Sequence, residues 1–290
     1  MDNIVDKLRD WRENCRRDPE ALRQLWPKLD WIEKQLSFEE RWTVIEQFCM
    51  AGIDLHDEEI IDTCLKRLRK QFPGSNRVKL LSLMAKYERV GNYDAALKCY
   101  DEMIDEDETN TSARKRKIAI LISQRKYVEA IRDLCDYLRR FMNDQEAWKE
   151  LCELYMLEQD YHKAVFCMEE LLLNNPLDHI YHTRLAELHY TIGSQESIEL
   201  ARSYYSQALK LNDKNIRALF GLHLTLTHII NTNQKLNANT RKEYEKQLSG
   251  IKTTLANLYN GVFQDICCVK KIKRIFCFQL MSSFTSLATN

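Results

Sequence analysis

The sequence predicts an all-α fold in which antiparallel helix pairs stack into a solenoid. Three matching residue pairs recur at an interval of 34 residues: Tyr93-x-x-Ala96, Tyr127-x-x-Ala130 and Tyr161-x-x-Ala164. A self-repeat of this length means that each unit buries its apolar face only against its neighbours. The 290 residues include only seven Gly and four Pro, which leaves few breaks for strands or tight hairpins. Function is therefore expected to reside in surfaces.

The composition argues against a nucleic-acid-binding protein. Lys plus Arg and Asp plus Glu number 43 each, so the chain has no net charge to hold a nucleic acid. Residues 1–11 lack the continuous apolar stretch of a secretory signal, and we expect a cytosolic protein. Its ten cysteines include no Cys-x-x-Cys pair. Those within helical patterns are expected to be reduced and to pack as small hydrophobes: Cys49, Cys64, Cys99, Cys135, Cys152 and Cys167.

The best-formed repeat unit spans residues 144–177. Residues spaced for one helix face recur on its two helices, which are marked by Trp148, Leu151 and Tyr155 and then by Ala164, Met168 and Leu171. Cys152 and Ala164 are small enough to let the two backbones approach. Pro176 cannot continue the second helix, so the unit is predicted to end there.

This spacing resembles the tetratricopeptide repeat, whose pattern is Trp, Leu, a small residue and Tyr, followed by Ala, an aromatic residue, Ala and Pro. The resemblance implies a tetratricopeptide-repeat solenoid. We expect regular repeats over residues 75–215, as units at about 75–109, 110–143, 144–177 and 178–214. Ala96, Ala130, Ala164 and Ala201 mark the small position of the second helices. The last unit has three extra residues, which we place in the turn at 193–195.

Less regular helices are expected on both sides of these units. Residues 1–36 are predicted to form two capping helices, with Asp18 as the N-cap before Pro19. Residues 37–74 form an irregular repeat that opens with a capping box of Ser37 and Glu40. Residues 215–260 form a helical pair whose second helix begins near residue 240 and ends near residue 259. Residues 261–290 combine a basic cluster with sixteen final uncharged residues, too few and too polar to span a bilayer, and are predicted to be a divergent, poorly ordered tail.

No residue pattern indicates catalysis, a cofactor or a metal. The sequence contains no Gly-rich phosphate loop, no Gly-x-Ser-x-Gly and no His-Glu-x-x-His. His182 and His189 occupy the positions that Trp148 and Tyr155 fill one repeat earlier. We therefore interpret them, with the nearby His179, as packing residues and not as zinc ligands. The chain is expected to be no enzyme and to bind no small-molecule substrate.

Four consecutive cations, Arg114, Lys115, Arg116 and Lys117, lie at the start of a predicted first helix, where the helix dipole disfavours positive charge. Two interpretations are open. The carboxylates of residues 105–108 screen the run on a solvated face, where exposed pairs contribute little stability. Alternatively, the run is a docking surface for an acidic segment of a partner.

The first helices of such a stack line its concave surface, and their inward positions are candidate partner contacts. A groove that mixes apolar and charged groups suits an extended or helical segment of another protein. The candidate positions are Lys149, Glu153, Met156, Thr183, Glu187, Tyr190, Phe220 and Leu224.

Five segments resemble a more particular family, subunit 2 of the endoplasmic-reticulum membrane protein complex. They are RKQFPGSNRVK at 69–79, NTSARKRKIAI at 110–120, DQEAWKEL at 144–151, ALKLN at 208–212 and RALFGL at 217–222, within a resemblance that covers residues 5–230. The resemblance implies a non-catalytic cytosolic scaffold within an insertase that places transmembrane segments, including tail anchors, into the membrane. It also implies partners among the other subunits, and a peripheral position on the cytoplasmic face through them. The apolar sequence from Cys267 onward departs from the family's hydrophilic ending, and an alternative C-terminus is the expectation there.

A soluble co-chaperone adaptor is the alternative function within the same fold. Such adaptors read an acidic C-terminal peptide with Lys and Asn on successive first helices. The predicted first helices around 80–90, 114–125, 148–158 and 182–192 contain no Asn, and Glu153 would repel a carboxylate. The resemblance therefore favours the membrane-complex scaffold.

Overall fold

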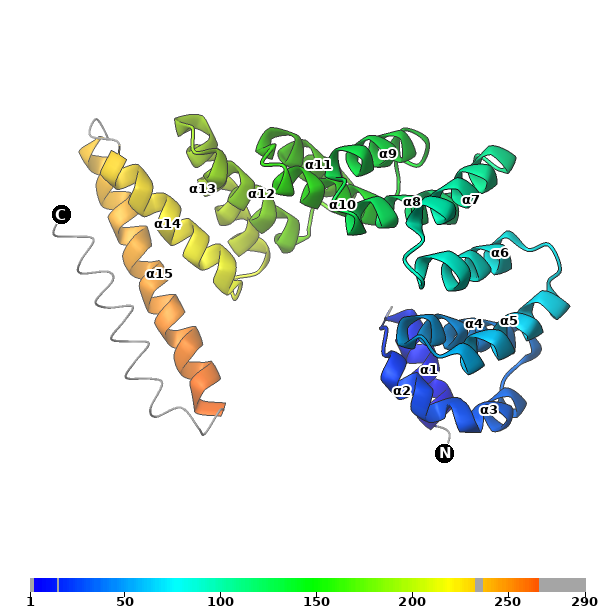
Figure 1. Ribbon diagram of the computed structural model, residues 1–290. Helices are drawn as coiled ribbons and strands as arrows, with labels where there is room; N and C mark the ends of the chain where they lie inside the picture. The colour runs from blue at the N-terminus through cyan, green and yellow to red at the C-terminus, as the bar shows by residue number, and fades with distance from the viewer. Residues whose placement is uncertain (1–2, 15, 233–236, 266–290) are drawn as a thin grey trace. The chain divides into compact units, whose positions relative to one another are not determined.

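The structure is a computed structural model that describes residues 3–14, 16–232 and 237–265. Within these residues the structure contains helices and no strands, which confirms the predicted all-α class. The chain divides into two compact units, Met1–Arg139 and Arg140–Asn290, and each is described by itself (Figure 1). The predicted tail falls mostly at 266–290, outside the described residues.

The first unit holds short helices at its N-terminal end and longer pairs after them. Its elements are α1 (Asn3–Glu13), α2 (Pro19–Leu25), η1 (Trp26–Lys28), α3 (Leu29–Gln35), α4 (Phe38–Leu55), α5 (Glu58–Gln71), α6 (Asn76–Leu83), η2 (Met84–Glu88), α7 (Tyr93–Glu106), α8 (Thr111–Ser123) and α9 (Tyr127–Arg140).

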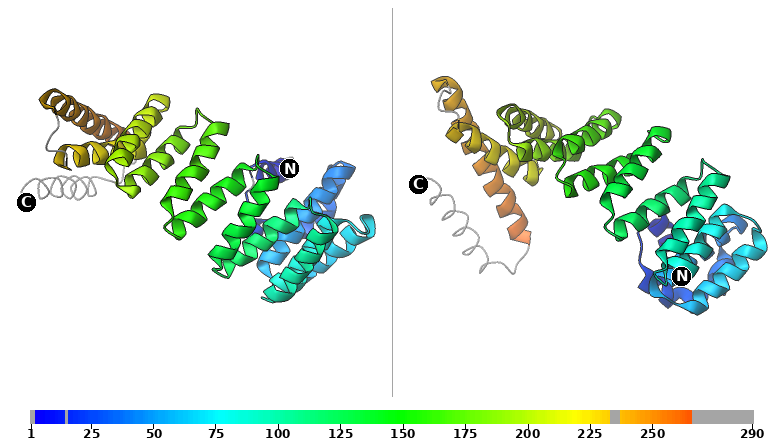
Figure 2. Two further views of the ribbon diagram at one scale, coloured as in Figure 1. Left: turned by 90° about the horizontal axis from the view of Figure 1, so that it is seen from above. Right: turned by 45° about the horizontal axis from the view of Figure 1, so that its top comes forward.

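The described residues of the second unit form three successive helix pairs, whose hairpins are visible in Figure 2. They are α10 (Gln145–Leu157) with α11 (Tyr161–Asn174), α12 (His179–Ile192) with α13 (Gln195–Leu211), and α14 (Ile216–Thr232) with α15 (Ala238–Asp265).

The N-terminal segment differs from the prediction of two capping helices. It contains three α-helices, α1 to α3, and one 3-10 turn, η1. Pro27 lies inside that turn and has no backbone N–H, so it cannot donate to the carbonyl four residues earlier. The α-helix that begins at Pro19 therefore ends at Leu25, and one tighter turn connects it to α3.

Side-chain caps explain where the helices begin. Both halves of the predicted capping box are present, because Ser37 accepts from the Glu40 amide and the Glu40 carboxylate accepts from the Ser37 amide. Asp18 accepts from the amide of Ala21, as its position before Pro19 predicts. These caps satisfy amides that have no partner within the helix. The same contact recurs at the starts of later helices, with Asn92, Asn110, Asp144, Asp160 and Ser194 as the acceptors.

The α10–α11 hairpin packs as its spacing predicts. Leu151 is buried, and the Cys152 thiol lies 3.5 Å from the carbonyl oxygen of Ala164. The half-buried Trp148 donates from Nε1 to the carbonyl oxygen of Met142 at 2.8 Å, and its ring meets Phe166 edge-on. Tyr155 is half-buried, Met168 and Leu171 are buried, and Pro176 follows the end of α11.

The four alanines that mark the second helices are completely buried. Ala96, Ala130, Ala164 and Ala201 each have no exposed surface. Because Ala has only a methyl group, a neighbouring helix backbone can come close at these points. All four alanines are thus buried at the positions where the repeat spacing predicts a small residue.

One repeat contains an irregularity that the spacing does not predict. The first helix of the unit at 75–109 changes from α6 to the π-helical turn η2, in which the amide of Arg89 donates to the carbonyl of Met84. Single π-helical turns inside α-helices frequently occur at functional sites. Here the turn leads to Glu88, whose contacts are described below.

The last helix is longer than predicted. It begins at Ala238 and continues to Asp265, five residues beyond the predicted end of the helical pair at 260. Tyr244, Ile251 and Leu255 are buried in a cluster with Leu222 and Leu226 of α14. Apolar residues spaced three to four apart, including the partly buried Leu248, thus form one apolar face along α15 that packs against α14.

Candidate partner-binding surfaces

The predicted cation run lies in the first turns of α8. Two of its members, Arg114 and Lys115, contact a backbone carbonyl and an aromatic ring. Arg114 is half-buried and donates from Nε to the carbonyl oxygen of Glu108 at 3.1 Å. The exposed Lys115 places its ammonium 5.7 Å from the centre of the Tyr137 ring. These two cations remain in contact with solvent.

Arg116 belongs instead to a largely buried ion pair. Its Nε and Nη2 donate to the carboxylate of Glu88, whose side chain is only 9% exposed. The hydroxyl of the fully buried Tyr100 donates to the same carboxylate. Burial and the neighbouring Glu88 raise the pKa of Tyr100, which therefore stays protonated.

Lys117 lies between two carboxylates, at 2.8 Å from Asp101 of α7 and 3.2 Å from Asp133 of α9. Burial opposes the charged form of Lys117, yet the hydrogen bond to Asp101 and the nearby Asp133 raise its pKa. The carboxylates that neutralise Arg116 and Lys117 therefore come from outside residues 105–108. Of the two open interpretations, screening by residues 105–108 therefore does not apply to Arg116 and Lys117.

The candidates on α10 form a mixed surface. Lys149 pairs with Glu146 at 2.9 Å and lies 5.8 Å above the ring of Tyr181 in α12. The hydrogen bond to Glu146 raises the pKa of Lys149. Glu153 is exposed and Met156 is half-buried, so both can reach another molecule.

The faces of α12 and α14 meet through charged and aromatic contacts. Glu187 pairs with Arg184 at 3.3 Å and accepts from Nη2 of Arg217 at 2.8 Å. Tyr190 meets the His228 ring edge-on, with 6.0 Å between ring centres. Beside them, Phe220 of α14 is half-buried and Leu224 is 53% exposed. The four candidates Glu187, Tyr190, Phe220 and Leu224 thus lie on two adjacent helices.

Thr183 does not belong to this surface, and the prediction that it contacts a partner is wrong. It is 4% exposed. Its hydroxyl donates to the carbonyl oxygen of His179 at 2.7 Å and accepts from the Asn215 amide at 2.9 Å. A Thr hydroxyl bonded within its own helix and to the next is a structural contact.

Two histidines of α12 pack against an aromatic ring, whereas the ring nitrogens of the third, His179, contact the side-chain amides of Asn212 and Asn215. His189 stacks on Tyr204 with 5.6 Å between ring centres and 7° between ring planes, and His182 lies tilted at 6.1 Å from the same ring. His182 and His189 thus pack in the hairpin, as their repeat positions predict. In the part of the chain that the structure describes, no three His, Cys, Asp or Glu side chains gather as a metal site would require.

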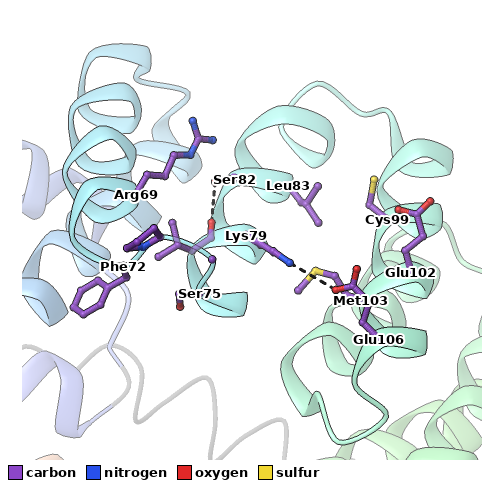
Figure 3. A pocket seen from close by; sticks show the side chains of 13 residues that line it. Arg69, Phe72, Ser75, Lys79, Ser82, Leu83, Cys99, Glu102, Met103 and Glu106 are labelled. Atoms are coloured by element: carbon purple, nitrogen blue, oxygen red, sulfur yellow. Dashed lines mark hydrogen bonds and ion pairs between the residues drawn. The ribbon is translucent and has the colours of Figure 1, made fainter.

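A hollow of about 450 Å³ opens beside α6 and α7 (Figure 3). Arg69, Phe72 and Lys79 line it from the α5–α6 side, and Glu102 and Glu106 line it from α7. Lys79 and Glu106 form an ion pair at 3.6 Å. Because the hollow holds both cations and carboxylates, its charges favour no single kind of ligand.

Sequence reasoning missed Glu88 as a functional or structural residue. In the repeat register Glu88 falls at the position of Met156, so a carboxylate replaces an apolar group. A charged residue in an apolar repeat position was the available signal. Its partner Arg116 is 28 residues away, and only the folded chain shows the pair.

The fold and these surfaces define a class of protein, the all-α helical-repeat proteins, with candidate contact faces on the first helices. The family model described as the EMC2 TPR-like repeat domain matches residues 60–210. This chain belongs to the ER membrane protein complex subunit 2 family.

Relatives from three organisms match much of the chain. ER membrane protein complex subunit 2 of Xenopus tropicalis is 43% identical over 258 residues, which cover 89% of this chain and 86% of that protein. The Dictyostelium discoideum protein of the same name is 31% identical, over 61% of this chain and 55% of that one. TPR repeat protein oca3 of Schizosaccharomyces pombe is 27% identical, over 76% of each chain.

Among solved structures, the crystal structure of YrrB, a TPR protein, has a TM-score of 0.45 and 15% identity, over 68% of this chain and 96% of that one. Separately, the described helices include none with the length and apolar character needed to cross a membrane.

Proposed function

We propose that this chain is a non-catalytic scaffold subunit of the endoplasmic-reticulum membrane protein complex. In this proposal it lies on the cytoplasmic face of the membrane, holds other subunits together, and so supports the insertion of transmembrane segments, including tail anchors. Family membership over 89% of the chain is the observation that carries the proposal. Membrane association is indirect and passes through partner subunits.

The accessible first-helix residues support a role in adhesion. Leu224 exposes an apolar side chain one helical turn after Phe220, and apolar groups next to charges are typical of protein contact sites. The proposed partner contacts are the accessible candidates Arg114, Lys115, Lys149, Glu153, Met156, Glu187, Tyr190, Phe220 and Leu224, whereas Arg116 and Lys117 are held by ion pairs within the chain. The proposal includes no cofactor, nucleic acid or small-molecule substrate.

Co-purification from solubilised microsomes tests the function. A tagged chain is expected to recover several membrane-complex subunits in fixed ratios, with or without residues 262–290. Recovery of chaperones alone would favour the co-chaperone adaptor and contradict the proposal.

A matched pair of variants locates the contact. Leu224→Asp on α14 is expected to lower the recovery of at least one subunit. Leu200→Asp on α13, where the side chain has a similar exposed fraction (46% against 53%), is expected to leave recovery unchanged. Equal recovery with both variants would remove the α12–α14 face from the proposal.

A further inference from the structure

A second hollow in the first unit gathers arginines from helices far apart in the sequence. Its volume is about 360 Å³, and α1, α4, α6, η2 and α8 contribute to its lining. Three guanidinium groups line it, those of Arg12, Arg77 and Arg116, against one carboxylate, that of Glu46. We call it the arginine hollow. Of the four cations at 114–117, only Arg116 lines it.

Two of the three arginines keep unused hydrogen-bond donors. Arg12 has a side chain only 23% exposed, yet within the described residues it makes no hydrogen bond, and its nearest carboxylate oxygen, on Glu40, is 4.0 Å away. Glu40 is already bound by Arg9 through two hydrogen bonds at 2.9 and 3.0 Å. The Arg9 side chain is the main cause that lowers the pKa of Glu40 to about 2, so this carboxylate is ionised but shared.

Arg77 is the more accessible of the two. Its Nε donates to Glu46 at 2.6 Å, while in the part of the chain that the structure describes neither of its terminal nitrogens has an acceptor. A guanidinium group offers five N–H donors in a planar fork that fits a carboxylate. Arg12 and Arg77 together therefore present a fork-shaped donor set to an incoming acid.

The floor of the hollow is apolar. Met50 and Leu80 are half-buried, and Leu81 and Met84 are buried beneath them. Met side chains adapt to irregular apolar partners. Beside this floor the side-chain oxygen of Gln47 is buried without a hydrogen-bond partner among the described residues. A buried acceptor without a donor costs free energy, which an N–H of a bound segment would relieve.

From these contacts we infer that the arginine hollow is a docking site for a segment of another polypeptide that carries carboxylates beside apolar side chains. The carboxylates bind Arg12 and Arg77, and an apolar side chain covers Met50 and Leu80. Charge complementarity selects acids over bases. The apolar floor selects a polypeptide over a phosphate polyanion, and the whole chain has no net charge to attract the latter.

The inference deepens the proposed scaffold function, because it gives the chemistry of one partner segment. Its test is separate from co-purification. The purified full-length chain is titrated against fluorescent synthetic helical peptides of equal length, and anisotropy is measured. One peptide alternates Leu and Glu in helical spacing; the others replace every Glu by Gln, every Glu by Lys, or every Leu by Ser.

The Leu/Glu peptide is expected to bind, and each of the other three is expected to bind at least about tenfold more weakly, since binding needs both charge and apolar contact. Binding should weaken with added salt. No binding of the Leu/Glu peptide would overturn the inference. Equal binding of the Leu-to-Ser peptide, or competition by inorganic polyphosphate at equal charge concentration, would show a general anion site and would also overturn it.

Charge reversal places the binding in the hollow. Arg77→Glu is expected to weaken binding of the Leu/Glu peptide by about tenfold. Arg132→Glu is the matched control, because both side chains are 71% exposed and each contacts one carboxylate through Nε, and it should change binding less than about twofold. Arg12→Gln gives a second, independent variant. Equal binding by all variants would overturn the inference, whether or not the chain co-purifies with membrane subunits.

Discussion

Two buried tyrosines, one in each unit, occupy the same repeat position and have different surroundings. Tyr100 and Tyr205 each follow a buried alanine by four residues, as Ala96-x-x-x-Tyr100 and Ala201-x-x-x-Tyr205. Tyr100 is fully buried and Tyr205 is 3% exposed. The residue sixteen positions further on, in the next first helix, is Arg116 in one case and Gly221 in the other.

That one residue decides how each tyrosine is accommodated. Around Tyr100, Arg116 enters the interface, and the Glu88 carboxylate binds both Arg116 and the tyrosine hydroxyl. Around Tyr205, the absence of a side chain lets the ring lie against the helix backbone, since a Cβ on Gly221 would overlap the Cζ of Tyr205. The repeat specifies a buried aromatic residue at this position. The next first helix can accommodate that residue either with an ion-paired arginine, as at Arg116, or with a glycine, as at Gly221.

Removing the cation from the first site should have the largest effect. Arg116→Ala leaves the Glu88 carboxylate buried without its ion-pair partner, and we expect a loss of about 3 kcal/mol in the free energy of unfolding. Urea unfolding followed by far-UV circular dichroism measures it. Arg132→Ala, which removes an exposed cation and leaves its partner Asp133 paired with Lys117, should change stability by less than about 0.5 kcal/mol.

A double variant sharpens the same comparison. Glu88→Met with Arg116→Met replaces the pair by apolar side chains and gives position 88 the residue found at Met156. Apolar replacement of a buried pair is often neutral, so most of the loss should be recovered. A double variant as unstable as Arg116→Ala would mean that shape, and not unpaired charge, dominates this site.

Filling the second site should have the next largest effect. Gly221→Ala forces the Tyr205 ring to move, and we expect a loss of about 2 kcal/mol from overpacking. Gly250→Ala in α15 is the matched control, because its added Cβ meets nothing within 4 Å. That change should stabilise by about 0.5–1 kcal/mol through helix propensity. Similar results for the two glycines would refute the close approach at Gly221.

Removing the hydroxyl group of either tyrosine should change the free energy of unfolding by less than Arg116→Ala or Gly221→Ala does. Tyr100→Phe removes a hydrogen bond to a carboxylate, and we expect a loss of about 1.5 kcal/mol. Within the described residues the Tyr205 hydroxyl has no hydrogen bond, so Tyr205→Phe should be nearly neutral. Equal losses in thermal or urea unfolding would contradict the assignment of Glu88 as the acceptor.

Mild acid should produce the smallest change, and in the second unit. Burial lowers the pKa of His189, with a smaller contribution from His162, while its ring stacks on Tyr204 and His182 lies against the same ring. The unfolded chain then binds a proton first as pH falls below about 6.5, so unfolding becomes easier. Stability measured between pH 7.5 and 5.5 should fall less steeply in His189→Phe than in the unchanged chain. Parallel curves for the two proteins would disprove this role.

Repeat spacing predicted the helices correctly because it depends on local periodicity. The positions of Ala96, Ala130, Ala164 and Ala201 predict buried small residues, and the caps at Asp18 and Ser37 predict helix starts, from neighbouring residues alone. The prediction of two helices before residue 37 was wrong, because a proline that shortens a helix does not show whether the chain continues into another.

The candidate surfaces were predicted less completely. The first-helix positions of α10, α12 and α14 follow from the period, and most of them are accessible. Thr183 follows the same period but is buried, because Asn215 of the next pair covers its hydroxyl. The cation run was visible in the sequence, whereas the pairing of Arg116 with Glu88, and of Lys117 with Asp101 and Asp133, was not.

The sequence by itself therefore determined the class of fold, the repeat register and the family, since each depends on residue types at fixed spacing. Tertiary structure alone decided which charges are neutralised and which remain available. Glu88 reaches Arg116 across 28 residues, and Arg12 and Arg77 line one hollow although 65 residues separate them. Such encounters depend on how side chains from different helices fill shared space, and no local spacing records that.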